Sequence, residues 1–211
     1  MKHDLILFDL DGTLSDPLEG IGKSFNYALK RFGYAERDFT ELRNFIGPPI
    51  DEAFSQTTGS LDRVHIAELV AKFRERYGQL GFSENKMYPG IREALDLLHS
   101  AGIPLAVCTS KRKDFADKIL SMFGIGDLFR FVSAGDVGIK KRKQISELRK
   151  HNLVTSSSLM VGDRAIDIIA AHDNGLSAAG VLWGYGSLFE LEQQRPEYLF
   201  NSIEEIKALG F

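Results

Sequence analysis

The second half of the chain alternates between short uninterrupted apolar runs and segments whose apolar residues recur with helical spacing. Uninterrupted runs are typical of strands buried on both faces of a parallel sheet, and they predict strands at residues 103–110, 129–136, 158–163, 176–183 and 198–201. Helical spacing, often closed by a glycine, predicts helices at residues 91–102, 113–124, 143–152 and 165–175. Repeated strand–helix units indicate an α/β fold with a doubly wound parallel sheet.

A long helical segment separates the first strand from the rest of the predicted sheet. The run LILF at residues 5–8 predicts that strand, and helical patterns then continue from Asp16 to Asn85. Because this segment lies between the first strand and the others, it is an insertion. We expect a core domain of residues 1–15 and 86–211 and a helical cap domain of residues 16–85.

The composition agrees with one soluble domain that carries an insertion. The 211 residues are 44% hydrophobic and 26% charged, which is ordinary for a globular protein. The single Cys108 cannot form an internal disulfide, as expected in a reducing compartment. A net charge of −3 gives no general attraction to nucleic acid or to an anionic membrane. We expect a cytoplasmic protein without nucleic-acid or membrane partners, and both a monomer and a dimer remain open.

Polar residues gather where the predicted strands end. Ligands of such sheets bind beyond the carboxyl ends of the strands. The residues found there include three pairs and a basic run between the second and third pair: Asp9 with Asp11, Thr109 with Ser110, Asp163 with Asp167, and Lys140 to Lys143. We expect the acids, a hydroxyl and a lysine to meet at one edge of the sheet.

This set of residues suits phosphoryl transfer. Residues two apart in an extended segment point to the same side, so Asp9 and Asp11 can face one ligand. Clustered carboxylates repel one another unless a hard cation such as Mg²⁺ lies among them. Such an ion would neutralise a phosphate and leave Asp9 free to attack phosphorus. Asp11 could then protonate the leaving oxygen, while the hydroxyl and the lysine hold the phosphoryl oxygens.

Each motif also has a structural interpretation. Two acids separated by one residue after a strand are often a turn, and a basic run is often a solvated face. The pairing of DLDGT with VGDRAIDIIAAHDNG is far more specific than either motif alone. Cations at the start of a helix oppose its dipole, which favours a nearby anion. The sequence leaves both Lys140 and Lys141 open as the phosphate-binding lysine.

Four motifs resemble those of the haloacid dehalogenase-like (HAD) hydrolases, in the same order and across the whole chain. They are DLDGTLSD, CTSK, the lysine run and VGDRAIDIIAAHDNG. The helical insertion after the first motif resembles the C1-type cap of that superfamily, set on a Rossmann-like core. FIGPPI in the cap and GVLWGYGS near the end are similar to the phosphoglycolate phosphatase-like group.

The resemblance implies a role for each motif residue. Asp9 would be the nucleophile, Asp11 the general acid/base, and Thr109 the hydroxyl that binds phosphate, with Ser110 and Gly12 beside the same phosphate. Mg²⁺ would be held by the Asp9 carboxylate, the Asp11 backbone carbonyl and Asp163, with Asp167 in support. Counting back from Ile145 favours Lys141 over Lys140 as the lysine.

The resemblance also implies an activity. It is that of a phosphatase on a small phosphorylated metabolite, phosphoglycolate-like in the first instance. A nucleotidase or pyrophosphatase and a phosphosugar mutase are the alternatives within the superfamily. A non-catalytic binding module on the same fold is disfavoured because all four motif positions are filled.

Overall fold

The computed structural model describes residues 3–210, and its centre is a six-stranded parallel sheet. The strands are β1 (Ile6–Phe8), β4 (Leu105–Arg112), β5 (Phe129–Gly135), β6 (Leu159–Gly162), β7 (Ser177–Val181) and β8 (Tyr198–Phe200). They lie in the order β5-β4-β1-β6-β7-β8. The chain moves from β1 through β4 to β5 and then returns to the other side of β1, which creates a topological switch point. The predicted doubly wound α/β class is confirmed.

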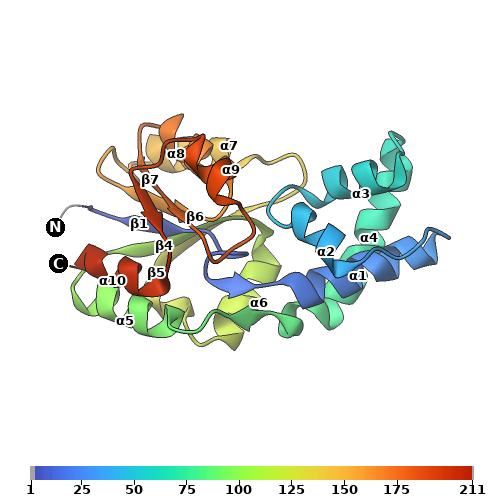
Figure 1. Cartoon of the computed structure of the whole chain (residues 1–211), viewed down its shortest axis with the longest axis horizontal. Helices are drawn as coiled ribbons and strands as arrows, with labels where there is room; N and C mark the ends of the chain where they lie inside the picture. Colours follow the sequence, from blue (N-terminus) through green and yellow to red (C-terminus); the bar gives the residue numbers. More distant parts are fainter. Residues whose placement is uncertain (1–2, 211) are drawn as a thin grey trace.

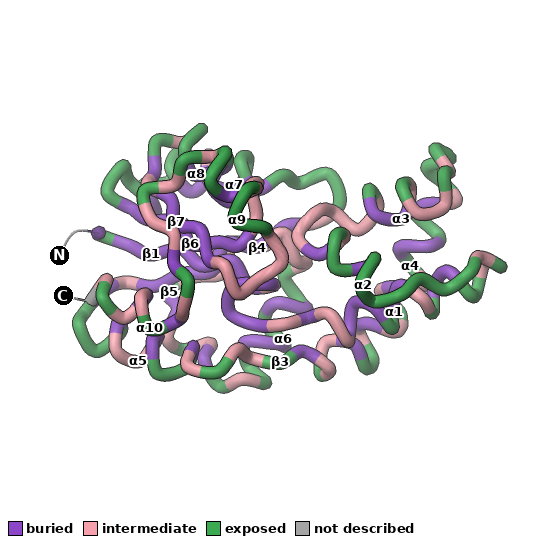
Figure 2. Tube along the Cα trace, viewed as in Figure 1, coloured by how far each residue is buried: buried purple, intermediate pink, exposed green. Residues whose placement is uncertain are grey.

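Helices cover both faces of this sheet (Figure 1). Alternate residues of β1 face opposite sides, so Ile6 and Phe8 belong to one hydrophobic cluster and Leu7 to another. Three helices pack on the first face, α5 (Ile91–Ser100), α6 (Lys113–Met122) and α10 (Ile203–Lys207). Three more pack on the second, α7 (Lys141–Lys150), α8 (Ala165–His172) and α9 (Leu188–Glu192). The inner strands β1, β6 and β7 and the first half of β4 are mostly buried, whereas the edge strands β5 and β8 are partly exposed (Figure 2).

A helical segment, residues 16–85, lies beyond the carboxyl ends of the strands (Figure 1) and is called the cap segment below. Two short antiparallel strands join it to the sheet, β2 (Ser15–Asp16) and β3 (Lys86–Met87). The elements between them are α1 (Leu18–Arg31), α2 (Phe39–Leu42), η1 (Arg43–Phe45), α3 (Ile50–Thr58), α4 (Arg63–Gln79) and η2 (Gly81–Glu84).

The cap segment has its own aromatic core. The rings of Phe25 and Phe54 stack at 4.2 Å between centroids, and Phe54 meets Phe73 edge to face at 6.4 Å. One core residue, Phe115 of α6, joins this cluster. Aromatic pairs at these separations are favourable beyond their buried area, so the cluster packs the cap helices against one another and, in this conformation, against α6.

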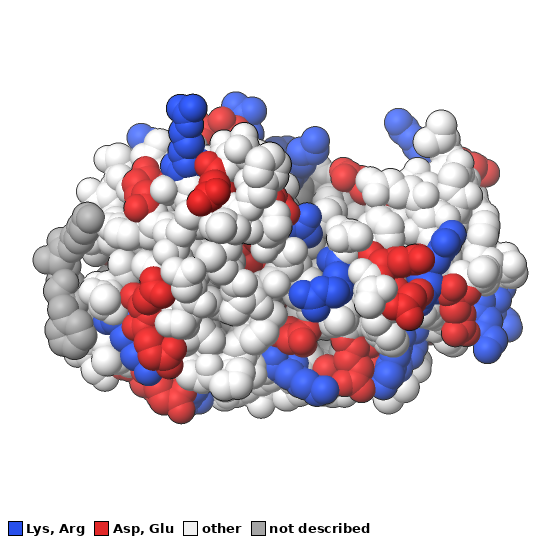
Figure 3. Space-filling view, in the orientation of Figure 1, with Lys and Arg blue, Asp and Glu red and all other residues white. Residues whose placement is uncertain are grey.

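Some boundaries differ from those that the sequence predicts. Helix α7 begins at Lys141 rather than at residue 143, and β4 continues to Arg112 rather than ending at residue 110. Asp16 lies in β2, so the cap segment is not helical from its first residue. Among residues 3–210, no helix combines the length and the apolarity that a bilayer crossing needs. On the face drawn in Figure 3, acidic and basic side chains are interspersed.

Candidate active site

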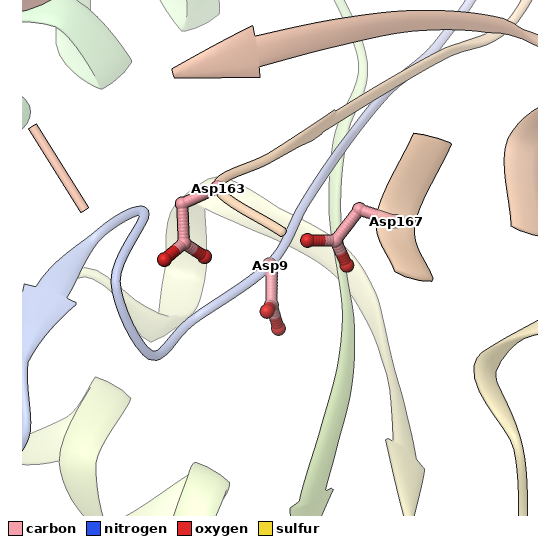
Figure 4. Close-up of side chains that lie close together, drawn as sticks. All are labelled: Asp9, Asp163 and Asp167. Carbon is pink, nitrogen blue, oxygen red and sulfur yellow. The ribbon is translucent and has the colours of Figure 1, made fainter. Parts of the chain in front are cut away.

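Three buried carboxylates meet at the carboxyl edge of the sheet (Figure 4). Asp9 directly follows β1, Asp163 directly follows β6, and Asp167 lies in the first turn of α8. One oxygen of each lies within 4.8 Å of the others. The two strands are neighbours in the sheet, and parallel strands end at the same edge. The predicted convergence of these acids is therefore present in the structure.

Backbone and side-chain groups hold the three carboxylates in place. The Asp9 carboxylate accepts a hydrogen bond from the backbone N–H of Leu10 at 2.8 Å. Asp163 accepts one from the N–H of Tyr185 at 2.8 Å, and Asp167 accepts one from the N–H of Arg164 at 3.0 Å. These bonds fix the direction of each carboxylate before any ligand binds.

Lys141 lies against two of the acids. Its side chain is 2% exposed, and its Nζ is 3.0 Å from Asp9 Oδ2 and in contact with Asp167 Oδ1. Burial by itself would lower the pKa of this ammonium, but the charges of Asp167 and Asp9 raise it above its usual value. The ammonium therefore stays charged. Lys140 and Lys143 are exposed, so the structure places Lys141 at the acids and leaves the other two lysines of the run in solvent.

Repulsion among the acids is visible in their ionisation. Burial and the charges of Asp167 and Asp9 raise the pKa of Asp163 well above its usual value. Burial raises the pKa of Asp167 to about 6, against the opposing charge of Lys141. The three carboxylates each have an oxygen within 4.8 Å of the others, and their ionised forms repel. A cation among them would relieve this repulsion, and carboxylate oxygens are the ligands that Mg²⁺ prefers. Asp9, Asp163 and Asp167 are therefore the side chains that could hold a metal ion.

Gly12 is required beside this cluster. Its φ is +85°, and a Cβ at this position would lie 2.1 Å from Asp163 Oδ2. Any side chain would therefore both strain the backbone and displace the Asp163 carboxylate. The geometry therefore supports a structural role for Gly12, which lets the loop after β1 approach Asp163 closely.

Asp11 is held differently from the other acids. Its Oδ2 is 2.6 Å from Nζ of Lys111, and that Nζ donates to the hydroxyl of Tyr77 at 2.8 Å. Burial raises the pKa of Asp11, while the ammonium of Lys111 opposes that rise. The Asp11 carboxylate is directed to Lys111, so any contribution of Asp11 to a metal site is left to its backbone carbonyl.

A cavity of about 100 Å³ opens between the sheet edge and the cap segment. Asp9, Asp11, Thr109 and Ser110 lie at its base. Thr109 is 1% exposed, and its Oγ1 accepts a hydrogen bond from the N–H of Lys111 at 3.2 Å. The cap segment contributes mainly apolar lining, namely Ile21, Phe45, Gly47, Pro48, Pro49, Ile50, Phe73, Arg74 and Tyr77. The cavity therefore joins the predicted phosphate end of the site to an apolar roof.

Arg164 connects the acidic cluster to that roof. Its Nε donates to Glu190 Oε1 at 2.9 Å, and its Nη1 donates to the carbonyl of Ile46 in the cap segment. The backbone of the same residue holds Asp167. A second contact across the same boundary places Arg43 over the ring of Tyr185 at 4.8 Å.

Lys111 and Tyr77 are site residues that the sequence reasoning did not assign. A signal for Lys111 was present, because residues two apart in a strand point to the same side and Lys111 follows Thr109 by two. The sequence contains no such signal for Tyr77, because its position fits the hydrophobic pattern of the buried face of α4. Its hydroxyl reaches the core only through the packing of the cap segment.

Comparisons with known proteins agree with this geometry. The family model described as haloacid dehalogenase-like hydrolase matches residues 6–181. A 5'-nucleotidase from Pseudomonas aeruginosa is 39% identical, over 99% of this chain and 96% of that protein. A phosphoglycolate phosphatase from Vibrio parahaemolyticus is 33% identical, over 96% of this chain and 93% of that protein.

A solved structure extends the agreement to three dimensions. A predicted phosphatase from Clostridium acetobutylicum superposes with a TM-score of 0.92 at 32% identity, covering 99% of this chain and 98% of that chain. The resemblance that the four motifs indicate is thereby confirmed. The chain belongs to the haloacid dehalogenase-like hydrolase family, as one of its phosphatases.

Proposed function

We propose that the protein is a Mg²⁺-dependent phosphomonoester hydrolase that works through an aspartyl-phosphate at Asp9. The observation that carries this proposal is the buried group of Asp9, Asp163 and Asp167 with Lys141 against it. Of this group, Asp9 lines the base of the cavity beneath the cap segment. An acid cluster that could hold a metal ion, with one of its carboxylates at the base of a cavity, is suited to nucleophilic attack on the phosphorus of a bound phosphate ester.

In the first step, an Asp9 carboxylate oxygen attacks phosphorus. The new P–O bond to Asp9 forms as the ester P–O bond breaks, and the departing alkoxide takes a proton from Asp11. The raised pKa of Asp11 favours the protonated form that this step needs. The alcohol leaves, and Asp9 carries the phosphoryl group.

In the second step, Asp11 acts as a base toward water. It takes a proton as the water oxygen attacks phosphorus, and the bond between phosphorus and Asp9 breaks. The products are inorganic phosphate and a free Asp9 carboxylate, and Asp11 is again protonated. A phosphosugar mutase would instead return the phosphoryl group to a sugar hydroxyl.

Mg²⁺, held by Asp9, Asp163 and Asp167 and by the Asp11 carbonyl, would supply positive charge that neutralises the phosphate. Lys141 would contact the phosphoryl oxygens from its place beside Asp9, and it restrains Asp9 for attack. Thr109, with Ser110 next to it, would donate a hydroxyl hydrogen bond to a phosphoryl oxygen at the base of the cavity. Preorganised contacts of this kind stabilise charge that develops in the transition state.

The proposal includes a division of the chain into a core (residues 1–15 and 86–211) and a movable cap (residues 16–85). Within residues 3–210, the chain passes between the two parts at the paired strands β2 and β3, and two adjacent crossings of this kind permit a hinge. Closure of the cap would exclude water while Asp9 is phosphorylated, and opening would release the product.

For the substrate, we propose a small phosphate ester of the phosphoglycolate type, for which the limited cavity volume and the phosphoglycolate phosphatase relative are the support. A nucleoside monophosphate is the second candidate. The 5'-nucleotidase relative favours this candidate. A second observation also favours it, because every cationic side chain in the described cavity lining is paired with a carboxylate of the protein. Those pairs are Arg74 with Asp136, Lys111 with Asp11, and Arg112 with Asp114, which leaves no free partner for a substrate carboxylate.

The test is phosphate release from p-nitrophenyl phosphate, 2-phosphoglycolate and a nucleoside 5'-monophosphate. We expect hydrolysis that stops with EDTA and returns with added Mg²⁺. The ratio of kcat/KM for phosphoglycolate to that for the nucleotide decides between the two substrate classes. Activity that continues unchanged after chelation contradicts the proposed mechanism.

A further inference from the structure

A chain of polar contacts runs from Asp11 into the cap segment. Asp11 Oδ2 is 2.6 Å from Lys111 Nζ, and Lys111 Nζ donates to the Tyr77 hydroxyl at 2.8 Å. Lys111 belongs to β4 in the sheet, whereas Tyr77 belongs to α4 in the cap segment. The ammonium that holds the Asp11 carboxylate is thus itself held by the part of the molecule that roofs the site.

These contacts are enclosed rather than solvated. The side chain of Lys111 is 6% exposed, and its Nζ lies 4.7 Å from the centroid of the Tyr77 ring. Burial by itself would lower the pKa of Lys111, but the carboxylate of Asp11 and the hydroxyl of Tyr77 together raise it. A charged ammonium in this place has to keep both partners, because a buried charge without partners is costly.

The Tyr77 ring can place its hydroxyl there only while the cap segment packs on the core. The ring stacks on Phe73 of the same helix at 5.3 Å and meets Phe115 of the core helix α6 edge to face at 5.0 Å. Tyr77 is 1% exposed. A movement of α4 away from α6 would therefore withdraw the hydroxyl from Lys111.

The other oxygen of Asp11 is buried without a hydrogen-bond partner among the described residues. Asp11 lines the cavity, and its Oδ1 is buried and makes no hydrogen bond to any residue that the structure describes. The side chain of Asn85 lies near the Asp11 carboxylate, but neither polar atom of that amide makes a hydrogen bond of ordinary geometry. A buried polar atom without a partner points to an absent one, and a substrate's leaving oxygen would supply it.

We propose that Lys111 and Tyr77 are positioning residues that direct Asp11 at the leaving oxygen, and that they do so only while the cap segment is closed. Lys111 restrains Oδ2, which leaves Oδ1 to exchange the proton with the leaving group. Tyr77 supplies the second anchor of the ammonium from the cap. The inference rests on the proposed function, because it assigns to Asp11 the proton transfer described there.

The experiment compares two esters of similar shape whose leaving groups differ in their need for a proton. Nitrophenolate departs from p-nitrophenyl phosphate without protonation, whereas the alkoxide of benzyl phosphate requires it. The quantity measured is kcat/KM, because it reports the steps up to loss of the leaving group. We expect Lys111→Met to lower kcat/KM for benzyl phosphate by about 10²-fold, the scale of general acid catalysis, and to change that for p-nitrophenyl phosphate by only about threefold.

Tyr77→Phe keeps the ring in the aromatic cluster and removes only the hydroxyl. We expect it to lower kcat/KM for benzyl phosphate by about tenfold, the scale of one hydrogen bond to a charged group, with p-nitrophenyl phosphate nearly unchanged. Lys111→Arg should restore part of the loss, because a guanidinium still donates to a carboxylate.

The matched controls lie outside the site. Tyr27→Phe removes a hydroxyl of α1 that donates to Glu75 of α4, the helix of Tyr77, at 2.7 Å on the exposed side of the cap segment. Lys113→Met removes an exposed ammonium that pairs with Asp117. Neither should alter the ratio of the two kcat/KM values, and thermal melting curves show whether each variant is folded.

Equal losses on both esters, in variants that melt like the wild type, would overturn the inference, since Lys111 would then serve the phosphate or the fold. A Lys111→Met variant that does not fold leaves the decision to Tyr77→Phe, and an unchanged ratio there overturns the inference too. If the wild-type protein hydrolyses neither ester, the proposed function fails and this inference fails with it.

Discussion

The two acids that follow β1 are held by different parts of the molecule. On one side, Asp9 directly follows the sheet strand β1 and meets Lys141 of α7, a helix that packs on the sheet. On the other side, Asp11 meets Lys111, whose second partner Tyr77 belongs to the cap segment. The nucleophile side is thus complete within the core, whereas the acid/base side is complete only with the cap in place. The difference suggests that bond formation at phosphorus and proton transfer to the leaving group depend unequally on closure.

Asp9→Asn should have the largest effect on activity. An amide is not nucleophilic enough to form the acyl phosphate, and loss of a nucleophile in enzymes of this kind costs about 10⁴-fold or more in rate. Phosphate release measures the loss. Asp127→Asn is the control, because Asp127 is exposed in the turn η3 (Gly126–Leu128), remote from the acids. Near-normal turnover by Asp9→Asn would show that the nucleophile is assigned to the wrong residue.

Asp11→Asn should separate the two sides of the comparison. We expect a loss of about 10²–10⁴-fold in turnover, because proton transfer is removed at both steps, while Asp9 stays able to attack. With p-nitrophenyl phosphate, a rapid burst of nitrophenolate should precede a slow steady state. Intact-protein mass spectrometry after acid quenching should show one added phosphoryl group. The absence of both the burst and the adduct would mean that Asp11 is also needed for the attack itself.

The nucleophile side could be predicted from the sequence because its geometry follows from the sheet. Asp9 and Asp163 come directly after apolar runs that form adjacent parallel strands, so their meeting at one edge needs no knowledge of side-chain packing. Lys141 was favoured by its distance from Ile145, and it lies at the acids although α7 begins two residues earlier than the pattern suggests. The apolar runs of the strands and the helical spacing of α7 are local patterns, so they can be recognised in the sequence.

The cap side could not be predicted to the same depth. β2 and β3 have two residues each, which is too short for a hydrophobic pattern. The contact of Tyr77 with Lys111 joins residues 34 positions apart across two separately packed cores. Such a contact depends on the angle at which α4 packs on α6, and the hydrophobic periodicity of either helix does not predict that angle.

Lys141→Ala tests the nucleophile side without removing an acid. We expect a loss of about 10²-fold or more in kcat/KM, the scale of one preorganised charge contact, because Asp9 and Asp167 would lose their shared ammonium. Lys143→Ala is the matched control, since Lys143 is an exposed lysine of the same helix. A severe loss in Lys140→Ala combined with a mild one in Lys141→Ala would contradict the contacts of α7 described above.

The smallest expected effect is the change in thermal stability when Mg²⁺ binds to Asp9, Asp163 and Asp167. Burial and the charges of Asp167 and Asp9 raise the pKa of Asp163. The three carboxylates should bind Mg²⁺ in the folded protein only, so Mg²⁺ should raise the melting temperature. At about 100 times the dissociation constant the gain is about 2.7 kcal/mol, or roughly 5–10 °C for a chain of this size. Asp163→Asn removes one ligand and most of the repulsion, so its melting temperature should not respond to Mg²⁺.

The cap side provides the control for this last prediction. Tyr77→Phe leaves all three carboxylates in place and should keep the full response to Mg²⁺, because the acid cluster is built by core elements. Differential scanning fluorimetry with Mg²⁺ and with EDTA measures both variants. If Tyr77→Phe lost the response as completely as Asp163→Asn, the metal site would depend on the cap segment, and the two sides of the site would not be held independently.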